Sequence, residues 1–219
     1  MSPTNDLRSD AVRNREALLE AAREVFAEMG LNAPLDEIAR RAGIGNATLY
    51  RRFPTRADLV HAVFAERMRE HLDAVAEALE IADPWDGFVA FVHALCLMQV
   101  RDRGIADLVT MDLSTAPEIE RSRSEALQGL HELAERAQDA GALRLDFTPE
   151  DVVVILMANA GLVRNAHEAG PKASARLVHL LLDGLRSASA TDGPRPPSRQ
   201  VMRRAMRRQS EELRLGPAD

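Results

Sequence analysis

The stretch LDEIARRAGIGNATLYRRFPTRADLVHAVF, residues 35–64, contains two short helical patterns that are joined by a glycine-containing turn. The first pattern begins at Leu35 and repeats apolar residues at helical spacing until Gly43, which is expected to end the helix. The second pattern follows at once and is closed by Pro54, which cannot continue a helix. Two short helices joined in this way are typical of a helix-turn-helix, whose second helix enters the major groove of DNA.

The charge of this stretch supports the same interpretation. The whole chain of 219 residues has a formal net charge of −6 at pH 7. Between Ile38 and Ala57, however, there is no acidic residue, and the basic residues are Arg40, Arg41, Arg51, Arg52 and Arg56. Because DNA affinity depends largely on contacts between basic side chains and phosphates, this pattern predicts a local binding patch rather than a protein that coats nucleic acid.

Polar side chains in the same stretch are suited to DNA contacts. Asn46 lies at the expected start of the second helix, where its amide can pair with a base edge. Thr48 and Tyr50 carry hydroxyls that suit phosphate oxygens. Thr55 is expected to cap the following helix, with Asp58 three residues on, and the first turn of that helix offers backbone N–H groups to a phosphate.

These residues together resemble the DNA-binding signature of the TetR family of transcriptional regulators. That signature has a helix, Ala-Gly-Val/Ile, a short recognition helix with Thr-Leu-Tyr, and then aromatic-x-x-Lys/Arg; it matches over about residues 12–64. The resemblance implies that Asn46, Ala47 and Arg52 face base edges. The residues implied to face phosphates are Thr48, Tyr50 and Arg56, and Arg51 completes the expected DNA-binding set.

The resemblance also implies a function for the whole chain. It predicts a transcriptional regulator, most often a repressor, that a small-molecule ligand releases from its operator. Since the chain carries one motif and two half-sites need two motifs, we expect a homodimer on palindromic double-stranded DNA. Asp36 departs from the pattern, because some members of the family carry a basic or polar residue there.

Helical periodicity continues to the end of the chain, and strand-like alternation is almost absent. We therefore predict an all-α fold in which an N-terminal three-helix helix-turn-helix domain is followed by a helical ligand-binding and dimerisation bundle. The expected divisions are residues 1–55 for DNA binding, 56–188 for the bundle and 189–219 for a flexible, arginine-rich tail in which 198–213 is able to form a helix.

Two late apolar helices are the expected dimer interface. The segment from Val152 to Val163 is apolar nearly all round, and the last helix of the bundle carries a leucine stripe that includes Leu181. A pair of such helices from each chain would form a four-helix interface. The alternative is that both helices build only the core of their own chain.

A pocket for an apolar effector is expected on the helices after Pro84. The apolar residues that suggest it include Phe91 and Leu108, and its predicted lining is Trp85, Phe88, Val92, Cys96, Met98 and Met111. Methionine and aromatic stripes at helical spacing are more often plain core, so the pocket is a hypothesis for the group rather than for each residue. His93, Asn159 and Asn165 are candidate polar groups for orienting a ligand, with a structural role as the alternative.

Other functional classes find little support. There is no HExxH, CxxC or nucleophile-elbow motif, and the histidines lack ligand spacing, so we expect neither an enzyme nor a metal site or cofactor. Cys96 is the only cysteine, and no stretch has the length and apolar character of a signal peptide or membrane span. We therefore expect a cytoplasmic protein. An adaptor that binds another protein instead of a small molecule stays an alternative.

Overall fold

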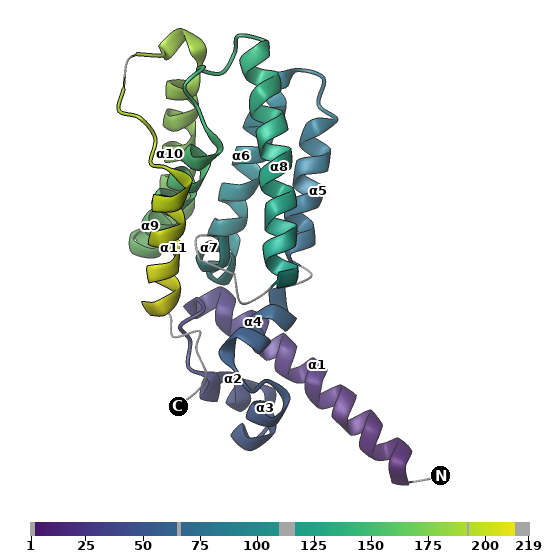
Figure 1. Ribbon diagram of the computed structural model, residues 1–219. Coiled ribbons are helices and arrows are strands. Elements are labelled where there is room, and N and C mark those ends of the chain that lie inside the picture. The colour runs from purple at the N-terminus through teal and green to yellow at the C-terminus, as the bar shows by residue number, and fades with distance from the viewer. Residues whose placement is uncertain (1–2, 65–66, 110–116, 192, 213–219) are drawn as a thin grey trace.

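The computed structural model describes residues 3–64, 67–109, 117–191 and 193–212. Within these ranges the chain is helical and contains no β-strand, only an isolated bridge between Leu143 and Arg186. The predicted all-α fold is confirmed. Figure 1 shows an elongated molecule, with a small group of helices at one end and an upright bundle at the other.

The smaller group consists of α1 (Pro3–Met29), α2 (Leu35–Ala42), α3 (Asn46–Arg52) and α4 (Arg56–Phe64). Phe26 of α1 and Phe64 of α4 stack at the centre of its core, with 6.0 Å between their ring centroids. Gly43 has φ 66° and closes α2, as predicted. One face of α4 is buried in this core through Leu59, Val60, Val63 and Phe64.

The bundle consists of α5 (Arg67–Leu79), α6 (Pro84–Arg101), α7 (Arg103–Val109), α8 (Pro117–Asp139), α9 (Pro149–Ala166) and α10 (Gly170–Leu185). Short 3-10 turns follow at His167–Ala169 and Ser187–Ser189. Figure 1 shows α6 behind the other long helices, between α5 and α8 on one side and α9 and α10 on the other. The short α7 lies across the junction and packs Ile105 and Leu108 into the core of the smaller domain. No helix in the described ranges is both long and apolar enough for a membrane span.

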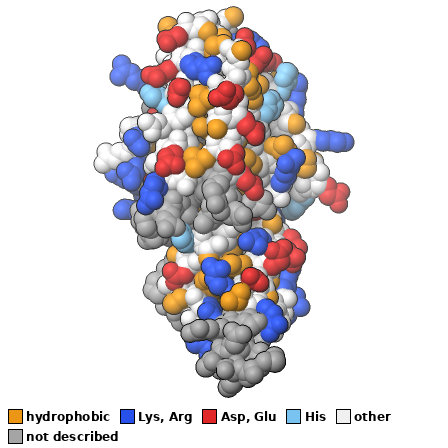
Figure 2. Space-filling view, turned by 90° about the vertical axis from the view of Figure 1, so that its right-hand side faces the viewer, with side chains coloured by type: hydrophobic (Ala, Val, Ile, Leu, Met, Phe, Trp, Pro, Cys, Tyr) orange, Lys and Arg blue, Asp and Glu red, His pale blue; other side chains and the backbone are white. Residues whose placement is uncertain are grey.

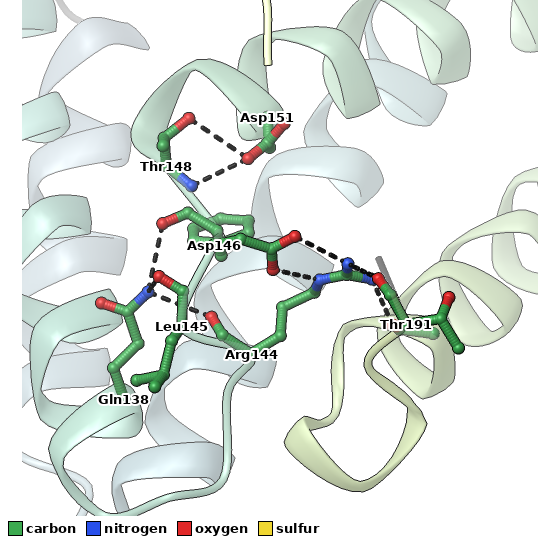
Figure 3. A network of polar contacts seen from close by, with 9 residues as sticks. Gln138, Arg144, Leu145, Asp146, Thr148, Asp151 and Thr191 are labelled. Carbon is green, nitrogen blue, oxygen red and sulfur yellow. Dashed lines mark hydrogen bonds and ion pairs between the residues drawn. The ribbon is translucent and has the colours of Figure 1, made fainter. Parts of the chain in front are cut away.

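A polar network fixes the turn between α8 and α9 (Figure 3). The side-chain amide of Gln138 donates to the backbone carbonyls of Arg144, Leu145 and Phe147. The guanidinium of Arg144 pairs with Asp146 and also donates to the Thr191 carbonyl, so the turn is tied to the chain that leaves α10. With its backbone carbonyls satisfied, this turn holds Phe147 edge-on against Phe88 of α6, at 5.2 Å between centroids.

A buried polar triad joins three helices of the bundle. The amide of Asn159 on α9 donates to the Gln99 side chain on α6 at 2.8 Å and accepts from the Ser174 hydroxyl on α10 at 2.7 Å. All three residues are buried, and Gln99 also donates to the Leu156 carbonyl. Both polar atoms of the Asn159 amide therefore serve the packing of α6, α9 and α10, which favours the structural alternative for this residue.

The C-terminal segment forms a helix within the range for which the sequence allowed one, residues 198–213. It contains α11 (Arg199–Glu212), which lies against α9 in front of the bundle (Figure 1). Met202 and Met206 are buried, and the Arg123 guanidinium of α8 donates to the Met206 sulfur at 3.3 Å. The methionines occur four residues apart, so they share one face of the helix and anchor it to the bundle.

Candidate nucleic-acid interface

The α3 helix is anchored by one face and presents the other to solvent. Leu49 and Phe53 are buried in the core of the smaller domain, while Thr48 is half-buried. The other predicted DNA-facing residues of this helix are exposed: Asn46, Ala47, Tyr50, Arg51 and Arg52. Five members of the predicted set are therefore exposed on one short helix, a geometry that suits insertion into a DNA groove, whereas Arg56 lies at the start of α4.

The first residue of α3 is held by α2. The Asn46 side-chain nitrogen donates to an Asp36 carboxylate oxygen at 2.7 Å. Gly45, which precedes α3, offers no side-chain cap, so this contact is what fastens the start of the helix to its neighbour. This bond uses one of the two N–H groups of the Asn46 amide, so the other N–H and the amide oxygen are the groups that can read a base edge.

The basic patch is narrower than the sequence predicted. Arg40 pairs with Glu37 at 2.7 Å, and Arg41 pairs with both Glu37 and Glu28, the latter at 2.6 Å. Hydrogen bonds from Arg40 and Arg41 lower the pKa of Glu37 to about 2. Both arginines of α2 are thus neutralised by acids that lie outside the acid-free stretch. Figure 2 likewise shows basic and acidic side chains interspersed over the face that it presents.

Arg56 holds the domain together in addition to its predicted role. Its Nη1 atom donates to the backbone carbonyls of Leu31 at 2.8 Å and Ala33 at 2.6 Å. Burial lowers the pKa of this guanidinium. Arg56 therefore ties the turn between α1 and α2 to the start of α4, and its contact with a phosphate stays a prediction.

The predicted cap of the helix after the recognition helix is present. The Asp58 carboxylate accepts from the Thr55 backbone N–H at 3.0 Å, and the Asp58 backbone N–H donates to the Thr55 hydroxyl at 3.1 Å. This reciprocal arrangement is a capping box. It satisfies the backbone N–H groups of Thr55 and Asp58, which lie in the turn that was expected to bind a phosphate.

A carboxylate that sequence reasoning missed joins the DNA-binding domain to the bundle. Asp107 of α7 accepts from the Leu31 backbone N–H at 2.9 Å and lies 3.6 Å from an Arg164 nitrogen of α9. A Cβ atom added at Gly30 would come within 2.6 Å of the Asp107 carboxylate, and Gly30 has φ 78°, so glycine is required there. The loop of residues 30–33 is thus held by α7 on one side and by Arg56 on the other.

We expect Asp107→Asn to stabilise the protein increasingly as pH rises from 4 to 7. Burial raises the pKa of Asp107, although the Leu31 N–H and nearby arginines act in the opposite direction. In this pH range the Asp107 carboxyl therefore binds more protons in the folded state than in the unfolded state. The free energy of unfolding of the wild type falls as pH rises and this carboxyl ionises. Asparagine keeps an oxygen acceptor for Leu31 without a charge.

Urea denaturation of the wild type and variant at pH 4, 5.5 and 7 measures this effect. Asp139→Asn, at an exposed position on α8, is the control and should follow the wild type. A variant that becomes less stable than the wild type as pH rises would show instead that the carboxylate gains more from Arg164 than burial costs.

The predicted effector-binding residues lie in two different cores. Trp85, Phe88, Val92 and Cys96 are buried together inside the bundle. The Arg186 guanidinium covers the Trp85 ring at 4.5 Å, and burial raises the pKa of the Cys96 thiol to about 12. Met98 packs against the core of the smaller domain instead, and Met111 lies outside the described residues.

One of the residues that suggested the pocket, Phe91, lines a cavity in the described part of the bundle. One apolar chamber of about 50 Å³ contacts α6 through Phe91 and Leu95. Both residues lie on the side of α6 that faces α8 and α9. The packing of the neighbouring helices decides which face of α6 meets this cavity, and the binding of an effector there stays a prediction. Among the described residues, no group of three or more possible metal ligands comes together.

Comparison with known proteins agrees with this architecture. Residues 18–63 match the model of the TetR family of bacterial regulatory proteins, and residues 83–187 match the C-terminal domain of SbtR-like transcriptional regulators. A curated relative, the HTH-type transcriptional regulator SAB2452 of Staphylococcus aureus, is 43% identical over 54 residues. That match spans 24% of this chain and only 29% of the relative, so it concerns the DNA-binding domain alone.

Solved structures cover more of the chain. The TetR transcriptional regulator SCO0520 of Streptomyces coelicolor is 31% identical, with 78% of this chain and 98% of that chain aligned and a TM-score of 0.51. A regulatory protein of the same family from Rhodococcus RHA1 is 21% identical, with 82% of this chain and 98% of that chain aligned and a TM-score of 0.58. At 21% identity, the likeness to the Rhodococcus protein shows a shared fold and nothing more.

Proposed function

The chain belongs to the TetR family of transcriptional regulators, and from this premise we propose that it is a sequence-specific repressor that a small molecule releases from its operator. The family and its relatives are regulators of transcription that carry a DNA-binding helix-turn-helix, so the chain is a regulator and not an enzyme. The observation that carries the proposal is the exposed face of α3. All its base-facing candidates, and Thr48 and Tyr50 among the phosphate-facing ones, belong to this one helix, which Leu49 and Phe53 hold in place; Arg56 lies at the start of α4.

A second copy of the chain is the proposed partner in DNA binding. On the outer face of the bundle, Val154 of α9 is 41% exposed and Leu180 of α10 is 51% exposed. Gly161 and Gly184 lie on the same two helices with open space beside them. Apolar residues interspersed with glycines allow the close approach of another helix pair, which supports a four-helix dimer interface.

The contacts at the domain junction support a route from effector to DNA. Arg164 of α9 and Asp107 of α7 belong to the bundle, whereas Leu31 and Arg56 belong to the DNA-binding domain. A ligand that shifts α7 or α9 changes the support of the loop before α2. Such a ligand favours dimers whose two α3 helices no longer match half-sites about 34–36 Å apart, and affinity for DNA falls by the coupling energy.

Selection of bound duplexes from a random DNA library with the full chain tests the proposal. We expect a palindrome with one helical turn between its half-site centres. Placed over a promoter, the selected site should lower transcription of a reporter gene in the presence of the protein. Failure to enrich any sequence would contradict specific DNA binding. A rise in transcription of the reporter gene would contradict repression but leave specific DNA binding intact.

A further inference from the structure

A groove of about 610 Å³ runs between α8 and α9, and α11 forms its outer wall. We call it the α8–α9 groove. Leu127 contributes to it from α8, Val153 from α9, and Met202 and Met206 from α11. Its volume is within the usual range of sites for small molecules, roughly 300–1,000 Å³.

The groove meets the apolar chamber that lies beside α6. Arg123, Leu127 and Val153 line both cavities, so these side chains form the boundary between them. The chamber is lined further in by Phe91 and Leu95 and has a volume of about 50 Å³. Since one water molecule takes up about 30 Å³ of liquid, the chamber admits only the end of an alkyl chain. A longer apolar molecule has to lie mainly in the groove.

Basic side chains gather along the groove. The Arg123 side chain is 15% exposed, and Arg199 and Arg203 line the groove from α11. The acidic residues along the groove are Glu120, which lies 3.7 Å from Arg123, and Glu150. Three guanidinium groups therefore face two carboxylates beside an apolar floor. Guanidinium groups recognise carboxylates and other oxyanions through paired hydrogen bonds.

We propose that the α8–α9 groove binds an elongated apolar molecule with one anionic end, whose alkyl part lies along Leu127 and Val153 and whose anion contacts Arg123. α11 is part of this site, because Met202 and Met206 cover the alkyl part and Arg199 and Arg203 add positive charge. The proposal rests on the proposed function insofar as this ligand is the effector.

Binding of sodium decanoate by the full chain tests the chemical class. Titration calorimetry below the aggregation concentration of decanoate should show saturable binding, and 1-decanol, the uncharged match, should bind more weakly. Arg123→Gln should weaken decanoate binding roughly tenfold and leave decanol unchanged, since it removes one charge-assisted hydrogen bond. Arg121→Gln, on an exposed position of the same helix, is the control and should bind decanoate like the wild type.

Two further variants test the location. Val153→Trp fills the boundary between groove and chamber and should abolish binding of both probes, while its melting temperature reports that it folds. The double variant Arg199→Gln/Arg203→Gln should weaken decanoate binding several-fold. Arg204→Gln/Arg208→Gln, on exposed positions of α11 that do not line the groove, should leave it unchanged.

The outcomes separate this site from the proposed function. Equal decanoate binding by the wild type and Val153→Trp would overturn the location, and equal affinity for decanoate and decanol would overturn the anionic class. Absence of decanoate binding by the wild type would overturn the site, even if the protein binds a selected operator. Decanoate binding by a protein that selects no DNA sequence would leave the site standing and remove its role as an effector site.

Discussion

Leu180→Arg should yield a folded monomer whose affinity for the operator is roughly a hundredfold lower than that of the wild type. Leu180 is 51% exposed on α10 and lies outside the core of its own bundle, so arginine is tolerated in the monomer. At the centre of a four-helix interface the same arginine would be a buried charge without a partner. A monomer loses the effective concentration that links two half-sites, a factor of about 10²–10⁴.

Sedimentation, circular dichroism and operator titration measure the three parts of this expectation. Leu145→Arg is the matched control, because Leu145 is 81% exposed in the turn before α9 and belongs to neither helix of the proposed interface. Leu181→Arg makes a useful contrast: Leu181 packs against the core of the bundle, so this change should lower the melting temperature of the chain itself. A Leu180→Arg protein that stays dimeric would show that α9 and α10 are not the interface.

Arg52→Ala and Asn46→Ala should each weaken binding to the selected operator by about 1–3 kcal/mol per half-site and relax its sequence preference. Both side chains lie on the exposed face of α3, at opposite ends of the helix. Each substitution removes the contact from both half-sites of a dimer. The loss of binding free energy for the whole complex is therefore about twice the loss per half-site. Operator and scrambled duplexes, titrated in parallel, separate base reading from general affinity.

Two neighbouring changes serve as controls for this interpretation. Asp36→Ala removes the carboxylate that holds Asn46 and should leave sequence preference intact while raising affinity for all DNA. Arg56→Ala should weaken binding to all sequences about equally, lower the slope of log K against log salt by roughly one unit, and also lower the melting temperature. A changed preference in Arg56→Ala with none in Asn46→Ala would mean that α3 docks differently.

The sequence determined the elements of this protein because helix signals are local. The turn at Gly43, the stop at Pro54 and the capping box at Thr55 each depend on residues within four positions along the chain, and all three are present. The exposed face of α3 follows from the same local periodicity, since burial of Leu49 leaves the residues around it outside. The signature within residues 35–64 was therefore sufficient to indicate the family.

Only the tertiary structure decided which charges and cavities meet. Arg41 finds Glu28 13 positions away, Asp107 accepts from Leu31 76 positions away, and Arg123 reaches Met206 83 positions away. No periodicity encodes such pairs, because they depend on how whole helices cross. For the same reason the pattern on α6 identified its apolar residues, Phe91 among them, while the packing of α8 and α9 decided which of them line a cavity. The basic patch is smaller in the structure than in the sequence, because acids from outside the stretch pair with Arg40 and Arg41. The groove beside α11 exists only because α8, α9 and α11 pack together.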